Sequence, residues 1–162
     1  MIPERETAQV GDHDLRLDAY LPYRLSVASN AVSGLIARAY QDRFGLTIPQ
    51  WRLICVLAED GGLTQVQLVA RMVMDKVTVS RAAQGLLKRR LVARSDHHAD
   101  GRSHVLALTA EGAGLHAEIA PLALAYEAAL IAGLAPEEVA LLKRLLTRLQ
   151  SAAGSLAGDA ST

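Results

Sequence analysis

The sequence predicts a mainly α-helical protein that carries a small β-hairpin, and three observations lead to that prediction. Half of its 162 residues are apolar but only 4% are aromatic, and the dominance of Ala and Leu favours packed helices over sheet. Apolar residues recur at helical spacing along most of the chain. The period changes to strand-like alternation only over residues 91–95 and 105–109, which predicts a hairpin.

A long helix is expected after an N-terminal arm of residues 1–16 that has no sustained period. Apolar residues repeat at helical spacing from about Leu17 to Phe44. Pro22 fits near the start of this helix, where its missing N–H costs little. Gly45 can adopt the left-handed conformation that ends a helix.

Three further helix starts are predicted from capping residues. Thr47 and Gln50 form a capping box that opens a helix to about residue 59, and Thr64 and Gln67 form a second one that opens a short helix. Asp75 is expected to cap the next helix. The buried stripe of that helix is predicted to comprise Val79, Ala82, Ala83 and Leu86.

Two long helices are expected after the hairpin. Thr109 is predicted to cap the first, over about 110–132, and Pro121 to kink it. The second is expected from about 136 to 153, and a small, polar tail over 154–162 is expected to be disordered.

This order of elements predicts a winged helix-turn-helix, in which a short helix, a tight turn and a second helix precede a two-stranded hairpin. We expect a single domain over 17–153. It would comprise a winged-helix lobe over 46–109 and flanking helices over 17–45 and 110–153.

Charge is unevenly distributed along the chain. The formal net charge is zero, yet eight basic residues oppose three acidic ones over 71–104, so this segment carries +5 and the remainder −5. A basic segment in an otherwise acidic protein can hold DNA phosphates locally and repel DNA elsewhere. Ordinary helical proteins also show uneven charge, so the charge distribution alone does not distinguish a DNA-binding protein from them.

The helix that follows Asp75 carries side chains suited to reading bases. Lys and Arg can bond guanine edges, Gln can bond adenine, and Val or Thr can touch a thymine methyl group. A solvated amphipathic helix would explain the charges but not the hydroxyl-rich first turn. With flanking positions included, the residues expected at DNA are Gln65, Lys76, Val77, Thr78, Ser80, Arg81, Gln84, Lys88 and Arg94.

The hairpin tip, Asp100-Gly101-Arg102, is the second stretch whose side chains suit contact with DNA. An Arg at a hairpin tip suits the negative potential of a narrow minor groove, and a carboxylate two residues away can fix its guanidinium. An ordinary polar hairpin with a weak surface ion pair is the alternative.

These two stretches resemble the MarR family of transcriptional regulators. Residues 100–109 match every fixed position of the family's wing pattern, which reads Asp, any, Arg, three residues, Leu or Val, any, Leu, Thr. Residues 75–81 and 91–94 resemble its recognition helix and first wing strand, and residues 45–52 its entry into the second helix. The resemblance spans about 17–150.

The resemblance implies a homodimer joined by the first, fifth and sixth helices, which binds double-stranded DNA at a pseudo-palindromic operator and acts as a repressor. Arg102 would enter the minor groove, with Asp100 as its partner. The chain departs from the family at Arg90, where many members carry Gly. A left-handed Arg would cost about 1 kcal/mol, so either this cost is borne or the turn is built differently.

Family members often hold a small aromatic or anionic effector between the dimerisation helices and the DNA-binding lobe. The polar and aromatic residues expected near such a cleft are Arg24, Ser29, Trp51 and Arg52. The arginines would favour a carboxylate, whereas Trp51 could equally be an ordinary core residue. The urate-responsive branch has Asp at the position of Arg52, which disfavours urate.

Enzyme chemistry is not expected. The sequence has no phosphate loop, dinucleotide fingerprint, metal-ligand cluster or nucleophile elbow, so we predict no catalytic residues, cofactor or metal. His97, His98 and His104 lack the companions of a zinc site. A winged helix that contacts only proteins is the remaining alternative, but it would not need the basic segment or the Asp100–Arg102 pair.

A cytoplasmic location without membrane contact is expected. No apolar run approaches the roughly 20 residues needed to cross a bilayer, and the charged N-terminus lacks a secretory signal. The single cysteine, Cys55, suits a reducing compartment. Its apolar neighbours predict a raised thiol pKa and a packing role rather than redox sensing.

Overall fold

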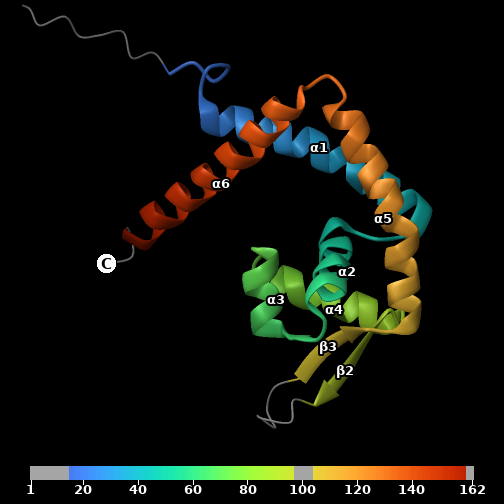
Figure 1. Ribbon diagram of the computed structural model, residues 1–162. Coiled ribbons are helices and arrows are strands. Elements are labelled where there is room, and N and C mark those ends of the chain that lie inside the picture. Colours follow the sequence, from blue (N-terminus) through green and yellow to red (C-terminus); the bar gives the residue numbers. More distant parts are fainter. Residues whose placement is uncertain (1–14, 97–103, 160–162) are drawn as a thin grey trace, which may run out of the picture. The chain divides into compact units, whose positions relative to one another are not determined.

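The computed structural model describes residues 15–96 and 104–159 (Figure 1). The helices are α1 (Leu21–Phe44), α2 (Ile48–Asp60), α3 (Gln65–Met72), α4 (Lys76–Lys88), α5 (Ala110–Ile131) and α6 (Pro136–Asp159), and the strands are β1 (Leu63–Thr64), β2 (Val92–Asp96) and β3 (His104–Leu108). The mainly α-helical class with a small hairpin is therefore confirmed. The chain divides into two units, before and after the Trp51–Arg52 bond.

The first unit holds α1 and the start of α2. Residues 17–19 form a turn, and α1 begins at Leu21 rather than at Leu17, so that Pro22 falls in its first turn. An earlier start would have placed this proline in the helix interior, where it removes a hydrogen bond and clashes with the preceding turn. Gly45 ends α1 with φ +63°. The two bonds of the predicted Thr47–Gln50 capping box are present, at 3.0 and 3.4 Å.

In the second unit, α3 and α4 begin at the predicted caps. Thr64 and Gln67 exchange both bonds of a capping box, and the Thr78 amide donates to Asp75 Oδ1 at 2.9 Å. The four residues of the expected α4 stripe are all buried, and they join a core that also contains Leu53, Ile54, Leu57, Leu68, Met72, Leu106 and Ile119.

The sheet has three antiparallel strands in the order β1-β3-β2. The hairpin pairs Val92 with Leu108 and continues to Asp96 opposite His104, as the alternation predicted to within one residue. Strand β1, which pairs Leu63 with Leu106, was not predicted from the sequence. A strand of two residues is too short to show alternation.

Within residues 15–96 and 104–159, two non-glycine residues have left-handed backbone conformations, and both end a helix of the lobe. Arg90 (φ +57°) follows α4, and the bonds from Arg90 N to Leu87 O and from Leu91 N to Leu86 O form a Schellman motif. Arg90 therefore bears the expected cost of about 1 kcal/mol. Val73 (φ +52°) ends α3. This conformation is rare for a β-branched residue, and nothing in the sequence predicted it.

The last two helices are long. Helix α5 continues through Pro121. Helix α6 reaches Asp159, so the expectation of disorder from Gly154 is wrong as far as that residue. The hydroxyls of Ser151 and Ser155 donate to carbonyls four residues back, and frequent alanines offset the low helix propensity of the two glycines in this segment. Within the described ranges no single helix is long and apolar enough to cross a membrane, and α5 and α6 pass such a test only as a pair bent by 106°.

Candidate nucleic-acid interface

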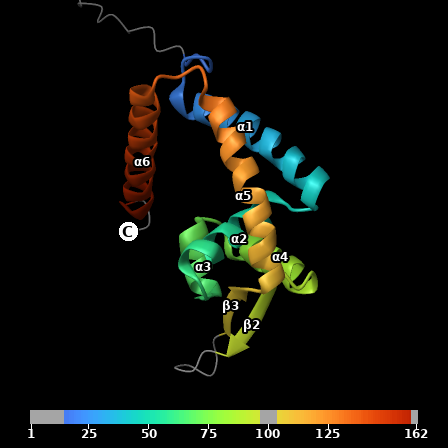
Figure 2. The same cartoon turned by 45° about the vertical axis from the view of Figure 1, so that its right-hand side comes forward.

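The helix-turn-helix and the hairpin form one lobe. Helix α3 packs against α4, α4 contacts β2, and α3 contacts both β1 and β3, and Figure 2 shows α3, α4, β2 and β3 lying together. Elements that are separate along the chain can therefore present side chains to one ligand.

An open hollow of about 490 Å³ lies on this lobe. Its lining comes from the start of α3, the start of α4 and both hairpin strands: Thr64, Gln65, Val66, Val69, Lys76, Arg94, His104 and Leu106. Gln65, Lys76 and Arg94, three residues expected at DNA, are thus brought together. The lining contains the basic residues Lys76 and Arg94 and the histidine His104, and none of its described residues is a carboxylate. Such a surface suits a phosphate backbone.

Val66 also lines the hollow, although sequence reasoning did not select it. Its side chain is 80% exposed. The available signal was its position two residues after the Thr64 cap, in the first turn of α3, where a helix-turn-helix approaches the nucleic acid.

Helix α4 presents most of the expected base-reading residues to solvent. Lys76, Val77, Arg81 and Gln84 are exposed, and so is Lys88 in the last turn. Thr78 and Ser80 are half-buried. The outward face that periodicity predicted is therefore present, opposite the buried stripe.

Thr78 is also held by its own helix cap. Its hydroxyl donates to Asp75 Oδ2 at 2.6 Å, and this bond, followed by the bond from the Thr78 amide, lowers the pKa of the Asp75 carboxyl. Because its hydroxyl hydrogen is committed, the Thr78 oxygen is left to accept a hydrogen bond, and its methyl group can meet a thymine.

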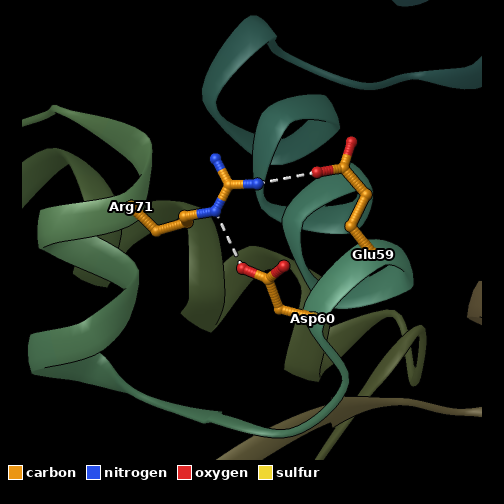
Figure 3. Close-up of polar contacts among 3 residues, drawn as sticks. All are labelled: Glu59, Asp60 and Arg71. Atoms are coloured by element: carbon orange, nitrogen blue, oxygen red, sulfur yellow. Dashed lines mark hydrogen bonds and ion pairs between the residues drawn. The ribbon is translucent and has the colours of Figure 1, made fainter.

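Arg71 bonds to protein carboxylates (Figure 3). Its Nε lies 2.8 Å from Asp60 Oδ2 and its Nη2 lies 2.8 Å from Glu59 Oε2. The hydrogen bond and charge of Asp60, with those of Glu59, raise the pKa of this guanidinium. The pair of acids ends α2, where a helix dipole disfavours negative charge. Arg71 thus links α3 to α2, and its charge must be left out of the basic excess of residues 71–104.

The tip of the hairpin lies outside the described residues. Asp100 and Arg102, and with them His97 and His98, therefore keep the status of sequence predictions. Among the residues that the structure does describe, no group of three or more His, Cys, Asp or Glu side chains could hold a metal ion.

The four residues expected near an effector are not gathered by α1 and α2 alone. Trp51 packs against the buried Tyr40 with ring centroids 5.2 Å apart, which gives it a core contact. Arg24 lies sixteen residues before Tyr40 on α1, a separation of about 24 Å along the helix axis. Ser29 and Arg52 are exposed. A shared effector site for these residues remains a prediction.

Cys55 is half-buried on α2. Burial, with a smaller contribution from Glu59, raises the pKa of its thiol to about 12, which confirms the expected direction. The thiolate is the reactive form, so this cysteine is poorly reactive at neutral pH.

The lobe, its hairpin and its basic hollow define a winged helix-turn-helix protein of the DNA-binding class. A model of the MarR family matches residues 44–103. The chain is 30% identical to the transcriptional regulator HosA of Escherichia coli O111:H- over 107 residues, 66% of this chain and 79% of that protein. The chain belongs to the MarR family of transcriptional regulators.

Solved structures agree with this assignment. A MarR family transcriptional regulator from Silicibacter pomeroyi DSS is 31% identical, with a TM-score of 0.73 over 84% of this chain and 91% of that one. BpsR of Bordetella bronchiseptica is 26% identical, with a TM-score of 0.79 over 85% of this chain and 97% of that one. In BpsR, 6-hydroxynicotinic acid regulates DNA binding.

Proposed function

We propose that this protein is a repressor that binds a pseudo-palindromic operator as a homodimer and responds to a small aromatic or anionic effector. The observation that carries the proposal is the hollow in which Gln65, Lys76 and Arg94 meet. It adjoins the start of α4, whose exposed face offers Arg81 and Gln84 to base edges. A cytoplasmic location is part of the proposal, since such a protein acts where its DNA is.

The proposal assigns the contacts to the major groove, the phosphates and the minor groove to different parts of the lobe. Helix α4 would lie in the major groove, where Arg81 suits guanine and Gln84 suits adenine. Lys88 and Arg94 would contact phosphates, which give affinity but no sequence choice. Arg102, held by Asp100, would enter the minor groove.

Unpartnered apolar surface supports the homodimer. Large apolar side chains are exposed on α1, on the second half of α5 and along α6: Leu21, Tyr23, Val27, Leu35, Leu124, Tyr126, Leu130, Leu141, Leu142, Leu145, Leu146, Leu149 and Leu156. Soluble monomers rarely expose so many together. We therefore keep residues 17–45 and 110–153 as dimerisation helices around a lobe over 46–109.

The effector proposal rests on family membership and on chemistry. The DNA binding of BpsR is regulated by an aromatic acid. In this chain, Arg24 and Arg52 could pair with the carboxylate of such an acid. Because Trp51 packs against Tyr40, which lies about 24 Å from Arg24 along α1, one site could use Arg24 and Trp51 together only if a second protomer contributed.

The test begins by recovering the bound sequence, from a random duplex library or from the promoter beside the protein's own gene. Salt titration with this operator should then give a steep linear fall of log K with log salt, since phosphate contacts release counterions. A winged helix that contacts only proteins would show neither enrichment of a sequence nor this slope.

Substitutions on α4 should separate base reading from phosphate contact. We expect Arg81→Ala and Gln84→Ala each to lose about 1–3 kcal/mol on the operator and much less on random duplex, because a base contact is sequence-dependent. Lys88→Ala should weaken both duplexes to the same extent. Fluorescence anisotropy at one salt concentration measures all three. Equal losses on both duplexes for Arg81→Ala and Gln84→Ala would remove α4 from the base-reading role.

A double-mutant cycle tests the hairpin tip. Arg102→Ala is expected to weaken operator binding more than Asp100→Ala, although the latter removes a negative charge near phosphates. Asp100 would hold the Arg102 guanidinium ready, which avoids part of an ordering cost of up to about 2 kcal/mol. The double variant should therefore lose less than the sum, and Arg102→Lys should not restore binding, because an ammonium lacks the planar fork. Tighter operator binding by Asp100→Ala, or strictly additive losses in the double variant, would show that Asp100 does not position Arg102 and that the hairpin acts only as a basic surface.

A further inference from the structure

One residue, Thr109, joins the start of α5 to the end of α4. Its amide donates to Leu91 O at 3.1 Å, and its hydroxyl donates to Arg90 O at 2.8 Å. The hydroxyl oxygen also accepts the Gly112 amide at 3.0 Å. A single side chain thus caps α5 and binds a carbonyl of the turn that closes the recognition helix.

Gly112 keeps this junction close. A Cβ at this position would lie 2.0 Å from Leu91 O and 3.2 Å from Leu108 Cδ2. The backbone of α5 therefore lies directly on the backbone that follows α4, with no side chain between them. The Arg90 turn is itself fixed by the two bonds of its Schellman motif. The connection between the two helices has little freedom to bend.

The two ends of α5 differ in their surroundings. Near the lobe, Gly112 and Ile119 are buried, whereas Leu124, Tyr126 and Leu130 are exposed and belong to the proposed dimer surface. Helix α5 is continuous through Pro121, so a change of angle at its exposed half is passed on to its buried first turns. The angle of α4 would then follow that of α5, through Thr109.

We propose that Thr109 is a positioning residue for DNA recognition, which fixes α4 relative to α5 and so sets the separation of the two recognition helices in the dimer. This inference rests on the proposed binding of an operator by a homodimer. Two fixed helices can fit only one half-site separation, because each added base pair lengthens the duplex by about 3.4 Å and rotates it. Loosening the junction should therefore relax the choice of spacing.

The test compares the recovered operator with versions whose half-sites are one base pair closer or farther apart. We expect the wild-type protein to prefer the original spacing strongly. Thr109→Val should reduce that preference about threefold to tenfold, the equivalent of one hydrogen bond, while Thr109→Ser, which keeps the hydroxyl, should retain it. Thr47→Val is the matched control, since it removes a capping hydroxyl of the same kind, whose bond to the Gln50 amide lies within the start of α2.

A second readout needs no DNA. Spin labels at position 88 of a Lys88→Cys, Cys55→Ala dimer report the distance between the two α4 helices. Thr109→Val should broaden this distance distribution, and Thr109→Ser and Thr47→Val should not. An unchanged distribution and an unchanged spacing preference in a folded Thr109→Val protein would overturn the inference and leave operator binding intact. A wild-type protein that selects no DNA would instead overturn the proposed function.

Discussion

Gly112→Ala is expected to destabilise the protein strongly, although alanine is the better helix former. The added Cβ would lie 2.0 Å from the backbone oxygen of Leu91, an atom that cannot rotate away as a flexible side chain could. Either α5 or the turn after α4 must move, which breaks the bonds through Thr109. We expect a net loss of about 2 kcal/mol, since a backbone clash falls at the upper end of the about 1–3 kcal/mol that overpacking typically costs, and the gain in helix propensity offsets about 1 kcal/mol of it.

Gly114→Ala is the matched control for this substitution. It makes the same chemical change two residues farther along α5, where an added Cβ has nothing within 4 Å. We expect it to stabilise the protein by about 0.5–1 kcal/mol through helix propensity and a less flexible unfolded chain. Urea unfolding at one fixed protein concentration measures both variants, because the stability of a dimer depends on concentration. Equal stability of the two variants would show that the junction does not constrain α5.

The elements that the sequence predicted best are those defined by local chemistry. Thr47, Thr64, Asp75 and Thr109 each cap a helix as expected, because a capping bond spans only three residues. The left-handed conformation of Arg90 could also be anticipated, since the helix pattern ended there without a glycine. The same local reasoning failed at Gly154, where the small, polar residues indicated the end of a helix that in fact continues to Asp159.

Features that depend on distant partners could not be predicted. The bonds of Arg71 to Glu59 and Asp60 join residues more than ten positions apart, so a count of charges along the chain assigned that arginine to the basic segment. The hollow, likewise, needs α3, α4 and the hairpin to be placed. Its members Gln65, Lys76 and Arg94 were selected separately, by residue type, and their common location is a result of the fold.

The α6 surface should decide whether the protein dimerises. Leu142 and Leu149 are 46% and 39% exposed, and their spacing of seven residues places them on one face of the helix. If the exposed part of each leucine is buried against a partner, each contributes somewhat less than half of the about 1.5–3 kcal/mol of a fully buried leucine, and each aspartate would also have to be desolvated, at a cost of about 1–3 kcal/mol. We expect Leu142→Asp/Leu149→Asp to raise the dimer dissociation constant by at least about a thousandfold, the equivalent of about 4 kcal/mol.

Thr147→Asp/Ser151→Asp is the control, because it adds two aspartates to α6 on the side away from Leu142. It removes only local bonds from these hydroxyls to carbonyls of their own helix, so it tests the charge and propensity effects alone. Sedimentation velocity at micromolar concentration should show the wild-type and control proteins as dimers and the leucine variant as a monomer with its helical circular dichroism largely retained. Operator affinity should fall together with dimerisation, since one lobe would then bind one half-site. A leucine variant that remains dimeric would exclude this face of α6 from the interface, and a well-folded wild-type monomer would exclude the homodimer altogether.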